Sequence, residues 1–212
     1  MSLRLFYDTE TTGLPLFDQP SDDPRQPHIV QLAAVLVDID NDYRRVSEFN
    51  LTVRPDGWEI PQDVSAIHGI TTERALAIGV PEKDAVTLLT SLWVLDGCIR
   101  VAHNESFDAR IVRIALKRYF DPAFKELATP PSDAWKQGAA ECTARMATPI
   151  MGLPPAERMR AAGRNHPKTP NLGEAYQHFT GNALDGAHDA MVDVNACIAI
   201  YRAMTKATEK AQ

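Results

Sequence analysis

The chain has 212 residues, of which 44% are hydrophobic and 24% are charged. This composition is ordinary for a soluble protein that buries a core without disulfide or metal support. The length predicts a single domain over residues 1–212. The formal net charge of −6 excludes the overall basic character of a tight duplex-binding protein, so any nucleic acid would be held locally.

The cysteines and the hydropathy pattern predict where the protein works. Cys98, Cys142 and Cys197 match no zinc-binding spacing and lie in apolar stretches, which predicts reduced core thiols in a cytoplasmic protein. The chain has no signal peptide and no apolar run of about 18 residues, so we expect neither secretion by the usual route nor a membrane span.

The first part of the chain predicts three strands. An apolar strand over residues 3–9 precedes a loop to about residue 27, where four prolines exclude a helix. Residues 29–38 are almost entirely apolar, which is typical of a strand buried on both faces. Turn residues lead from there into a third strand over 44–53, so the second and third strands form a hairpin.

Helical patterns dominate the rest of the chain. Helices are predicted, in chain order, over residues 63–67, 71–77, 81–95, about 106–120, 172–179 and 188–205, and strands over 98–102 and 138–143. Residues 121–136 predict a loop, and residues 149–170 an irregular or weakly helical segment. The order of elements resembles the ribonuclease H-like α/β fold, a mixed five-stranded sheet with helices on both faces.

Three short segments, residues 6–13, 103–108 and 186–193, contain four carboxylates and one histidine: Asp8, Glu10, Asp108, His188 and Asp193. On a strand, Asp8 and Glu10 point to the same face. Two carboxylates on one face of an otherwise apolar strand repel each other and lose hydration. A divalent cation removes that cost, and Mg²⁺ or Mn²⁺ prefers oxygen ligands.

Each segment alone also has a simpler interpretation. Glu10 could be a solvated residue at the end of its strand. Asp108 could be an acidic residue that favours the first turn of a helix, and His188 could be an exposed histidine in a capping region. These interpretations do not explain the order in which the three segments occur.

Together the segments resemble the Asp-x-Glu, Asp and His-x4-Asp signature of the DEDDh 3′–5′ exonucleases. This is the DnaQ-like family of the proofreading epsilon subunit of DNA polymerase III and of phage-type exonucleases. In the second segment, Asn104 and Phe107 stand before Asp108 at the family's spacing. Residues 67–71 and 172–181 also resemble family elements, and the histidine in the third motif identifies the subclass.

The resemblance implies hydrolysis of phosphodiester bonds from the 3′ end of DNA, preferably single-stranded or frayed, with release of nucleoside 5′-monophosphates. Asp8, Glu10 and Asp193 would hold one Mg²⁺ or Mn²⁺ ion. Asp8 would bridge to a second ion, which Asp108 would support. His188 would act as the general base, because an ordinary histidine pKa of ~6.5 suits that role near neutral pH.

The resemblance also implies a set of substrate contacts near the motifs. Thr11 and Thr12 would grip the terminal nucleotide, and Leu14 would pack on the last bases. The other expected contacts are Ile67, His68, Asn104 and Phe107. For Leu14 and Ile67, ordinary core packing is an open alternative.

Two basic stretches carry opposite expectations. Arg160 and Arg164 belong to a basic segment before the third motif, which we expect to contact substrate phosphates. A second basic face is expected to be a solvated helix surface: Arg110, Arg113, Lys117 and Arg118. The acidic, proline-rich loop over residues 14–28 is expected to rim the active site or to be a passive surface loop.

Alternatives to a DNA exonuclease are an RNA exonuclease of the same superfamily, a phosphodiesterase of small nucleotides and a non-catalytic nucleic-acid-binding module. The metal-site residues do not separate DNA from RNA, because discrimination depends on contacts to the 2′-hydroxyl. A DNA polymerase partner is also open. The sequence shows no evident docking tail beyond Lys206, which favours a stand-alone or phage-type nuclease.

Overall fold

A computed structural model describes residues 1–95, 98–124 and 126–209. Its centre is a mixed sheet with the strand order β3-β2-β1-β4-β5. β2 is antiparallel to β1 and β3, whereas β4 and β5 run parallel to β1. The strands are β1 (Leu3–Thr11), β2 (Ile29–Asp38), β3 (Arg44–Thr52), β4 (Ile99–Ala102) and β5 (Ala140–Cys142).

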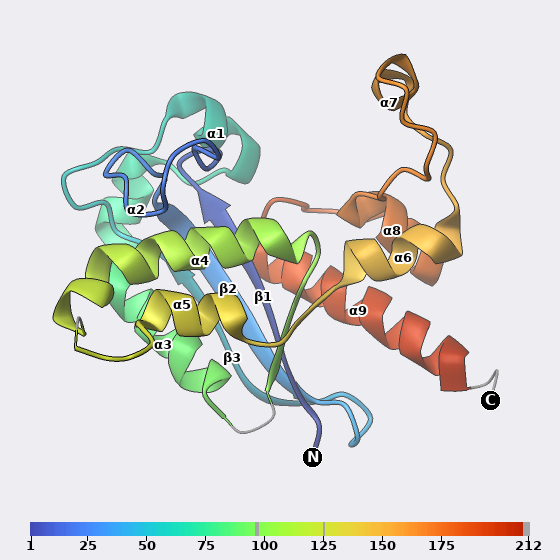
Figure 1. Ribbon diagram of the computed structural model, residues 1–212, viewed down its shortest axis with the longest axis horizontal. Helices are drawn as coiled ribbons and strands as arrows, with labels where there is room; N and C mark the ends of the chain where they lie inside the picture. Colours follow the sequence, from blue (N-terminus) through green and yellow to red (C-terminus); the bar gives the residue numbers. More distant parts are fainter. Residues whose placement is uncertain (96–97, 125, 210–212) are drawn as a thin grey trace.

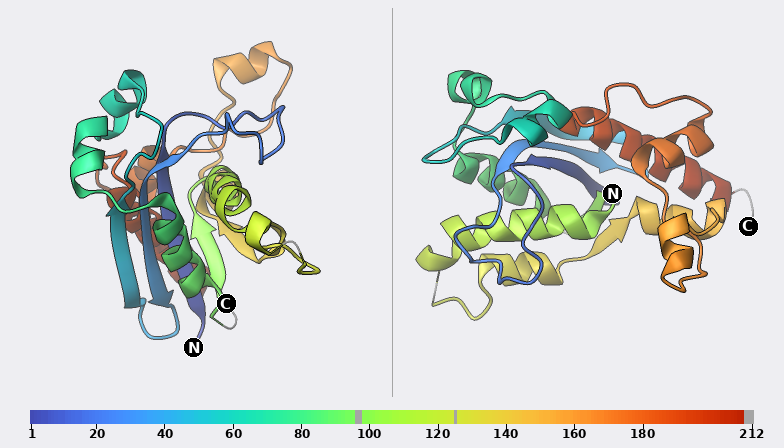
Figure 2. Two further views of the ribbon diagram at one scale, coloured as in Figure 1. Left: turned by 90° about the vertical axis from the view of Figure 1, so that its left-hand side faces the viewer. Right: turned by 90° about the horizontal axis from the view of Figure 1, so that it is seen from above.

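Helices cover both faces of the sheet, as Figures 1 and 2 show. One face is covered by α3 (Glu82–Trp93), α4 (Glu105–Tyr119) and α5 (Pro131–Gln137), and the other by α6 (Thr143–Met151), α8 (Leu172–Thr180) and α9 (Ala190–Glu209). The remaining helices are α1 (Gln62–His68), α2 (Thr72–Ile78), the 3₁₀ helix η1 (Asp121–Ala123) and α7 (Glu157–Ala161). The predicted α/β class with a five-stranded mixed sheet is confirmed.

Side-chain alternation along β1 separates two core layers. Tyr7 points toward the α3–α5 side, where its ring meets that of Trp135 with 5.6 Å between centroids. Phe6 points the other way and meets Tyr201 of α9 at 5.4 Å. Because even-numbered positions of β1 face α9, Asp8 and Glu10 at the end of the strand face the start of that helix.

Tertiary packing creates helices that the sequence did not predict. The predicted loop over 121–136 contains η1 and α5, and residue 125 within it lies outside the described residues. Trp135 is fully buried, and its indole N–H donates to the carbonyl of Ala109 at 3.1 Å. This burial stabilises α5, which begins with Pro131.

The region after β5 also differs from expectation. The strand predicted over 138–143 is shorter, and Thr143 already begins α6. This helix continues through Pro149 to Met151, into the segment predicted as irregular. Thr143 and Ala147 of α6 are buried, so packing under α9 and α8 outweighs the local irregular signal.

Helix ends show smaller differences. Asn104, directly before α4, has a left-handed backbone (φ 67°) and makes no side-chain cap hydrogen bond. Pro81 precedes α3 rather than lying in its first turn. The helix predicted over 172–179 is α8, which Gly181 ends with a left-handed backbone (φ 78°). Cys98 and Cys197 are buried and Cys142 is half-buried, all as free thiols. Among the described residues, no helix has the length and apolarity needed to span a bilayer.

A buried carboxylate, Glu82, ties the loop before β2 to α3 and α4. Its oxygens accept from His28 Nδ1 at 2.8 Å, the backbone N–H of Ile29 at 2.9 Å and the Tyr119 hydroxyl at 2.8 Å. Arg118 lies 3.2 Å away and also donates to the carbonyl of Gln26. Burial alone would raise the pKa of Glu82, but the hydrogen bond and charge of His28, with Arg118, lower it below the usual value.

We predict that Glu82→Ala lowers the free energy of unfolding by ~3–5 kcal/mol, because it leaves Arg118 and His28 without their anion. The pKa of Glu82 is depressed, so its stabilisation is present above ~pH 4.3 and is lost as the pH falls through the folded-state pKa. The free energies of urea unfolding of wild type and Glu82→Gln should therefore converge as the pH falls through the folded-state pKa of Glu82. Glu59→Gln, at an exposed position, is the control. A wild-type advantage that persists in acid would contradict the assignment.

Candidate active site

The end of β1 presents two carboxylates to the start of α9. Asp8 and Glu10 are half-buried and are paired across the ladder with Ala33 and Gln31 of β2. Both lie beyond Phe6, the last β1 residue paired with β4. The sheet is therefore open beside them, and side chains from α4 and α9 can approach.

Asp108 enters this opening from the first turn of α4. Its side chain is buried, and one carboxylate oxygen, Oδ1, accepts from the backbone N–H of Thr9 at 3.1 Å and from the Thr9 hydroxyl at 2.7 Å. Because β4 ends at Ala102, Asp108 takes the place of a strand partner for this N–H group. The interaction fixes the position of α4 relative to β1.

Gln31 holds the start of α9 against the sheet. Its amide oxygen accepts from the backbone N–H of Ala190 at 3.1 Å, and its amide nitrogen donates to Asp189 Oδ2 at 3.3 Å. Asp189 Oδ1 in turn accepts from the N–H groups of Met191 and Val192, as an N-cap. Sequence reasoning missed Gln31. The only signal was a polar residue in an otherwise apolar strand.

The anchored start of α9 also positions His188 and Asp193. The helix was predicted to begin near His188 but begins at Ala190, because His188 has a left-handed backbone (φ 69°). The N–H of His188 donates to Asp193 Oδ2 at 3.3 Å, and its side chain is exposed. Glu10, His188 and Asp193 each offer one atom that could bind a metal ion, and these three atoms lie within 4.8 Å of one another.

The carboxylates are hard to ionise together. Burial, followed by the charges of Asp108, Asp193 and Glu10, raises the pKa of Asp8 well above its usual value. Burial and the neighbouring acids raise the pKa of Glu10 to about 8. Burial raises the pKa of Asp108 to about 7, although its hydrogen bonds from Thr9 oppose the shift. Burial also raises the pKa of Asp193. Burial is the largest cause of all four shifts, and the negative charge of neighbouring acids adds to it.

The residues present fit a divalent cation. Four carboxylates and one imidazole converge, and the donor set is dominated by oxygen, as Mg²⁺ and Mn²⁺ prefer. Among the described residues, Asp193 Oδ1 is buried without a hydrogen-bond partner, which is costly unless a cation accepts its lone pairs. The atoms of Glu10, His188 and Asp193 are already close enough to share one ion.

Two predicted substrate contacts are exposed apolar side chains. Leu14 is 75% exposed and Ile67 is 56% exposed. The alternative that they are ordinary core residues is therefore wrong. The hydroxyls of Thr11 and Thr12 are both hydrogen-bonded to backbone groups of the loop. The Thr11 hydroxyl donates to the Gly13 carbonyl, and the Thr12 hydroxyl accepts from the His28 N–H.

His68 and Phe107 lie near the motifs in different settings. His68 Nδ1 accepts from the N–H of Ile70 at 3.1 Å, and its buried Nε2 has no partner among the described residues. Burial and the proximity of His188 lower the pKa of His68. Phe107 packs against the core, and Asn104 is exposed at the start of α4.

Of the two basic segments, only the face of α4 differs from expectation. Arg160 and Arg164 are exposed on and after α7, which projects from the body of the molecule in Figure 1. The face of α4 is not simply solvated. Arg110 donates to the carbonyls of Leu16 and Gln19, and Arg118 donates to Gln26 and contacts Glu82. These arginines tie the proline-rich loop to α4.

Comparison with known proteins places this geometry in a family. The sequence matches the RNase T exonuclease family over residues 5–201. It is 33% identical over 116 residues to DNA polymerase III PolC-type of Thermotoga petrophila, a match that covers 52% of this chain and 7% of that protein.

Solved structures agree in fold. Exonuclease I of E. coli in complex with a dT13 oligonucleotide superposes with a TM-score of 0.73 at 20% identity, over 100% of this chain and 42% of that one. The zinc-bound form of the E. coli Exonuclease I–single-stranded DNA complex gives 0.69 at 23% identity, over 99% and 42%. This chain thus spans less than half of Exonuclease I. It has the ribonuclease H-like fold and belongs to the exonuclease family, in the DEDDh, DnaQ-like class that its three motifs predicted.

Proposed function

We propose that this chain is a single exonuclease domain over residues 1–212 that removes nucleotides from the 3′ end of DNA with the help of divalent cations. The observation that carries the proposal is the convergence of Asp8, Glu10, Asp108, His188 and Asp193 at the open end of β1. A non-catalytic binding module would gain nothing from four buried or half-buried acids that repel one another.

The residues support distinct roles in phosphodiester hydrolysis. Asp8, Glu10, Asp193 and Asp108 would hold two Mg²⁺ or Mn²⁺ ions, which when bound would offset the negative charge of the scissile phosphate and of the leaving oxygen. His188 is exposed beside Glu10 and Asp193, so its ring can take a proton from an attacking water. Asp193 accepts from the His188 backbone N–H and thereby orients the loop that carries the base.

Single-stranded DNA is the favoured substrate. Two E. coli Exonuclease I structures contain dT13 and dA16 oligonucleotides, and a further complex with single-stranded DNA holds a zinc ion. The net charge of −6 suits a strand end gripped locally better than a duplex. We propose that the exposed Leu14 and Ile67 pack on unstacked bases, and that Thr11, Thr12 and His68 contact the terminal nucleotide. The match to a segment of a PolC-type polymerase supports a DNA polymerase as a partner.

We predict that wild-type protein with Mg²⁺ or Mn²⁺ shortens 5′-labelled single-stranded DNA from its 3′ end, seen as a ladder on a denaturing gel. His188→Gln should lower the rate by ~10²–10⁴-fold, the range for loss of a general base. Asp8→Asn should lower it further, because it removes an ion ligand. His178→Gln, at an exposed histidine of α8, is the matched control and should cleave normally. Equal activity of His188→Gln and His178→Gln would remove His188 from the mechanism.

A second prediction separates DNA from RNA. On matched single-stranded oligonucleotides, we expect faster shortening of DNA than of RNA, measured as initial rates under the same salt and metal. Discrimination depends on contacts to the 2′-hydroxyl, which the carboxylates do not provide. Faster RNA shortening would favour the RNA exonuclease alternative, and cleavage of a small phosphodiester alone would favour the phosphodiesterase.

A third prediction concerns the metal-free protein. The raised pKa values of Glu10 (about 8) and Asp108 (about 7) mean that their contribution to stability is fully present below the unfolded value near ~4. It is lost as the pH rises through ~7 to ~8. We expect Tm in EDTA to fall by roughly 5 °C between about pH 5.5 and about pH 8.5. Saturating Mn²⁺ should raise Tm mainly at the higher pH, where the ligands are ionised.

The control for that measurement is the variant Asp8→Asn/Glu10→Gln. It removes two of the repelling charges, so both the pH dependence and the response to Mn²⁺ should shrink. An unchanged Mn²⁺ response would show that the cation stabilises the protein at another site.

A further inference from the structure

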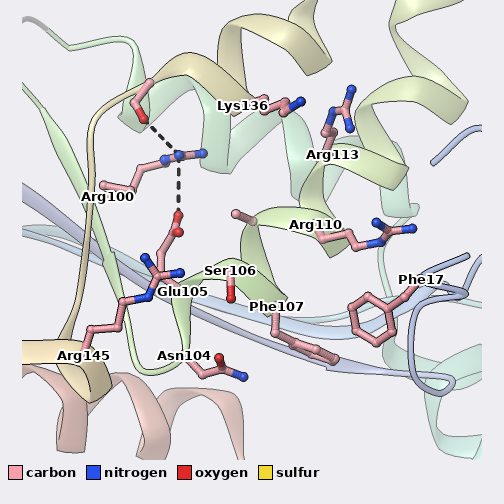
Figure 3. A pocket seen from close by; sticks show the side chains of 13 residues that line it. Phe17, Arg100, Asn104, Glu105, Ser106, Phe107, Arg110, Arg113, Lys136 and Arg145 are labelled. Atoms are coloured by element: carbon pink, nitrogen blue, oxygen red, sulfur yellow. Dashed lines mark hydrogen bonds and ion pairs between the residues drawn. The ribbon is translucent and has the colours of Figure 1, made fainter. Parts of the chain in front are cut away.

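A cavity of about 690 Å³ lies beside the candidate active site, between the start of α4, the end of α5, β5 and the proline-rich loop. Figure 3 shows Lys136 and Arg113 on one side of it, Arg145 on another, and Arg110 with Phe17 on a third. Asn104 and Phe107 of the second motif line the same cavity. The catalytic Asp108 follows Phe107 directly, so cavity and active site share one helical turn.

The cavity is strongly basic although the protein is acidic. Five cations line it, Arg100, Arg110, Arg113, Lys136 and Arg145, against one acid, Glu105. Arg100 pairs with Glu105 at 3.5 Å, and Arg113 pairs with Asp133 at 3.2 Å. In the described parts of the chain, Arg110, Lys136 and Arg145 have no acidic partner within ion-pair distance. Positive charge therefore exceeds negative charge at this surface, in a chain with a net charge of −6.

Several arginine nitrogens beside the cavity are buried and lack a hydrogen-bond partner in the described part of the chain. The Arg100 side chain is 3% exposed and stacks on Trp135 with its guanidinium 4.0 Å from the ring centre. Its Nη2 donates to the carbonyl of Gly138 at 3.2 Å. Its Nε and Nη1, and the Nε atoms of Arg110 and Arg113, are buried without a hydrogen-bond partner among the described residues. Such donors are costly unless an anion or water meets them.

An aromatic ring stands at the mouth of the cavity. Phe17 is 64% exposed and lines the cavity beside Arg110. The guanidinium of Arg110 lies 5.3 Å from the centre of its ring, and Arg110 also binds the carbonyls of Leu16 and Gln19. The tether presents the ring at a fixed position. Cations that track a backbone beside an exposed aromatic ring form the usual site for single-stranded nucleic acid.

We propose that this cavity holds the phosphates of the substrate strand upstream of its 3′ end, with Lys136 and Arg145 as phosphate contacts and Phe17 as a stacking platform for a base. The proposal rests on the proposed exonuclease function and names the path by which the strand leaves the catalytic site. Asn104 and Phe107 line the cavity and also belong to the second motif, so the cavity is continuous with the candidate active site. This continuity favours a polymer strand over a free phosphate or a small nucleotide, because only a strand would occupy both places at once.

The test uses the full chain carrying Asp8→Asn, so that bound strands stay intact. Fluorescence anisotropy would measure its affinity for 5′-labelled oligo-dT of ~3 to ~12 nucleotides between ~50 and ~200 mM salt. We expect affinity to rise with strand length. In Lys136→Gln/Arg145→Gln that rise should be lost, with binding of the longest strand about tenfold weaker at low salt and the salt slope smaller by ~1.4.

A second variant tests the platform without changing charge. Phe17→Ala should weaken binding of the longer strands about tenfold while leaving the salt slope as in the parent.

Arg44→Gln, at the exposed first residue of β3, is the charge control for the double variant. Lys136 and Arg145 are exposed and unpaired in the part of the chain that the structure describes, so an unchanged Tm is expected for the double variant.

Two results would overturn the proposal. The first leaves the proposed exonuclease function intact, and the second contradicts that function as well. If the double variant matches Arg44→Gln in affinity and salt slope while wild type still shortens DNA, the cavity is not on the strand's path and the exonuclease function stands. If wild type shortens no oligonucleotide and the parent binds none, both proposals fail together.

Discussion

Electrostatic repulsion among four carboxylates at the open end of β1 is the constraint on which the rest of the structure depends. Asp8, Glu10, Asp108 and Asp193 all have raised pKa values because they are desolvated together. Left to themselves, such groups would separate or take up protons. The fold must therefore restrain three elements, β1, α4 and α9, at the point where repulsion drives them apart.

The restraints are hydrogen bonds from neutral groups on the sheet. Thr9 gives Asp108 two donors, from its backbone and its hydroxyl, and so fixes α4 to β1. Gln31 gives α9 one acceptor and one donor, through Ala190 and Asp189. Neither restraint adds charge to the site. The negative potential is thus preserved for cations, whereas a lysine or arginine in these places would have neutralised it.

The sequence predicted the charged residues of the site better than the groups that hold them. Strand alternation predicts that Asp8 and Glu10 share one face. Their role in a site, like that of His188 and Asp193, was predicted from the resemblance of three motifs to a family. Gln31 was not predictable, since its partners lie about 160 positions away and glutamine in a strand has no specific meaning. The helix α5 was missed for a similar reason: Trp135 is stabilised by contacts with β1 and α4 that no local pattern encodes.

The proline-rich loop connects the restraint of the site to the basic cavity. Its two ends are joined at Thr12 and His28, which exchange hydrogen bonds, and His28 also binds the buried Glu82. Its middle is held by Arg110 through the carbonyls of Leu16 and Gln19. With both anchors on rigid elements, a loop of irregular backbone can present Leu14 and Phe17 to solvent at defined positions. Asp23 of the loop pairs with Arg25 inside the loop itself. Arg110, Lys136 and Arg145 line the cavity, whereas the carboxylates lie at the open end of β1. In our proposal, the cavity attracts the backbone of the strand, and the carboxylates mark the place where its end is cut.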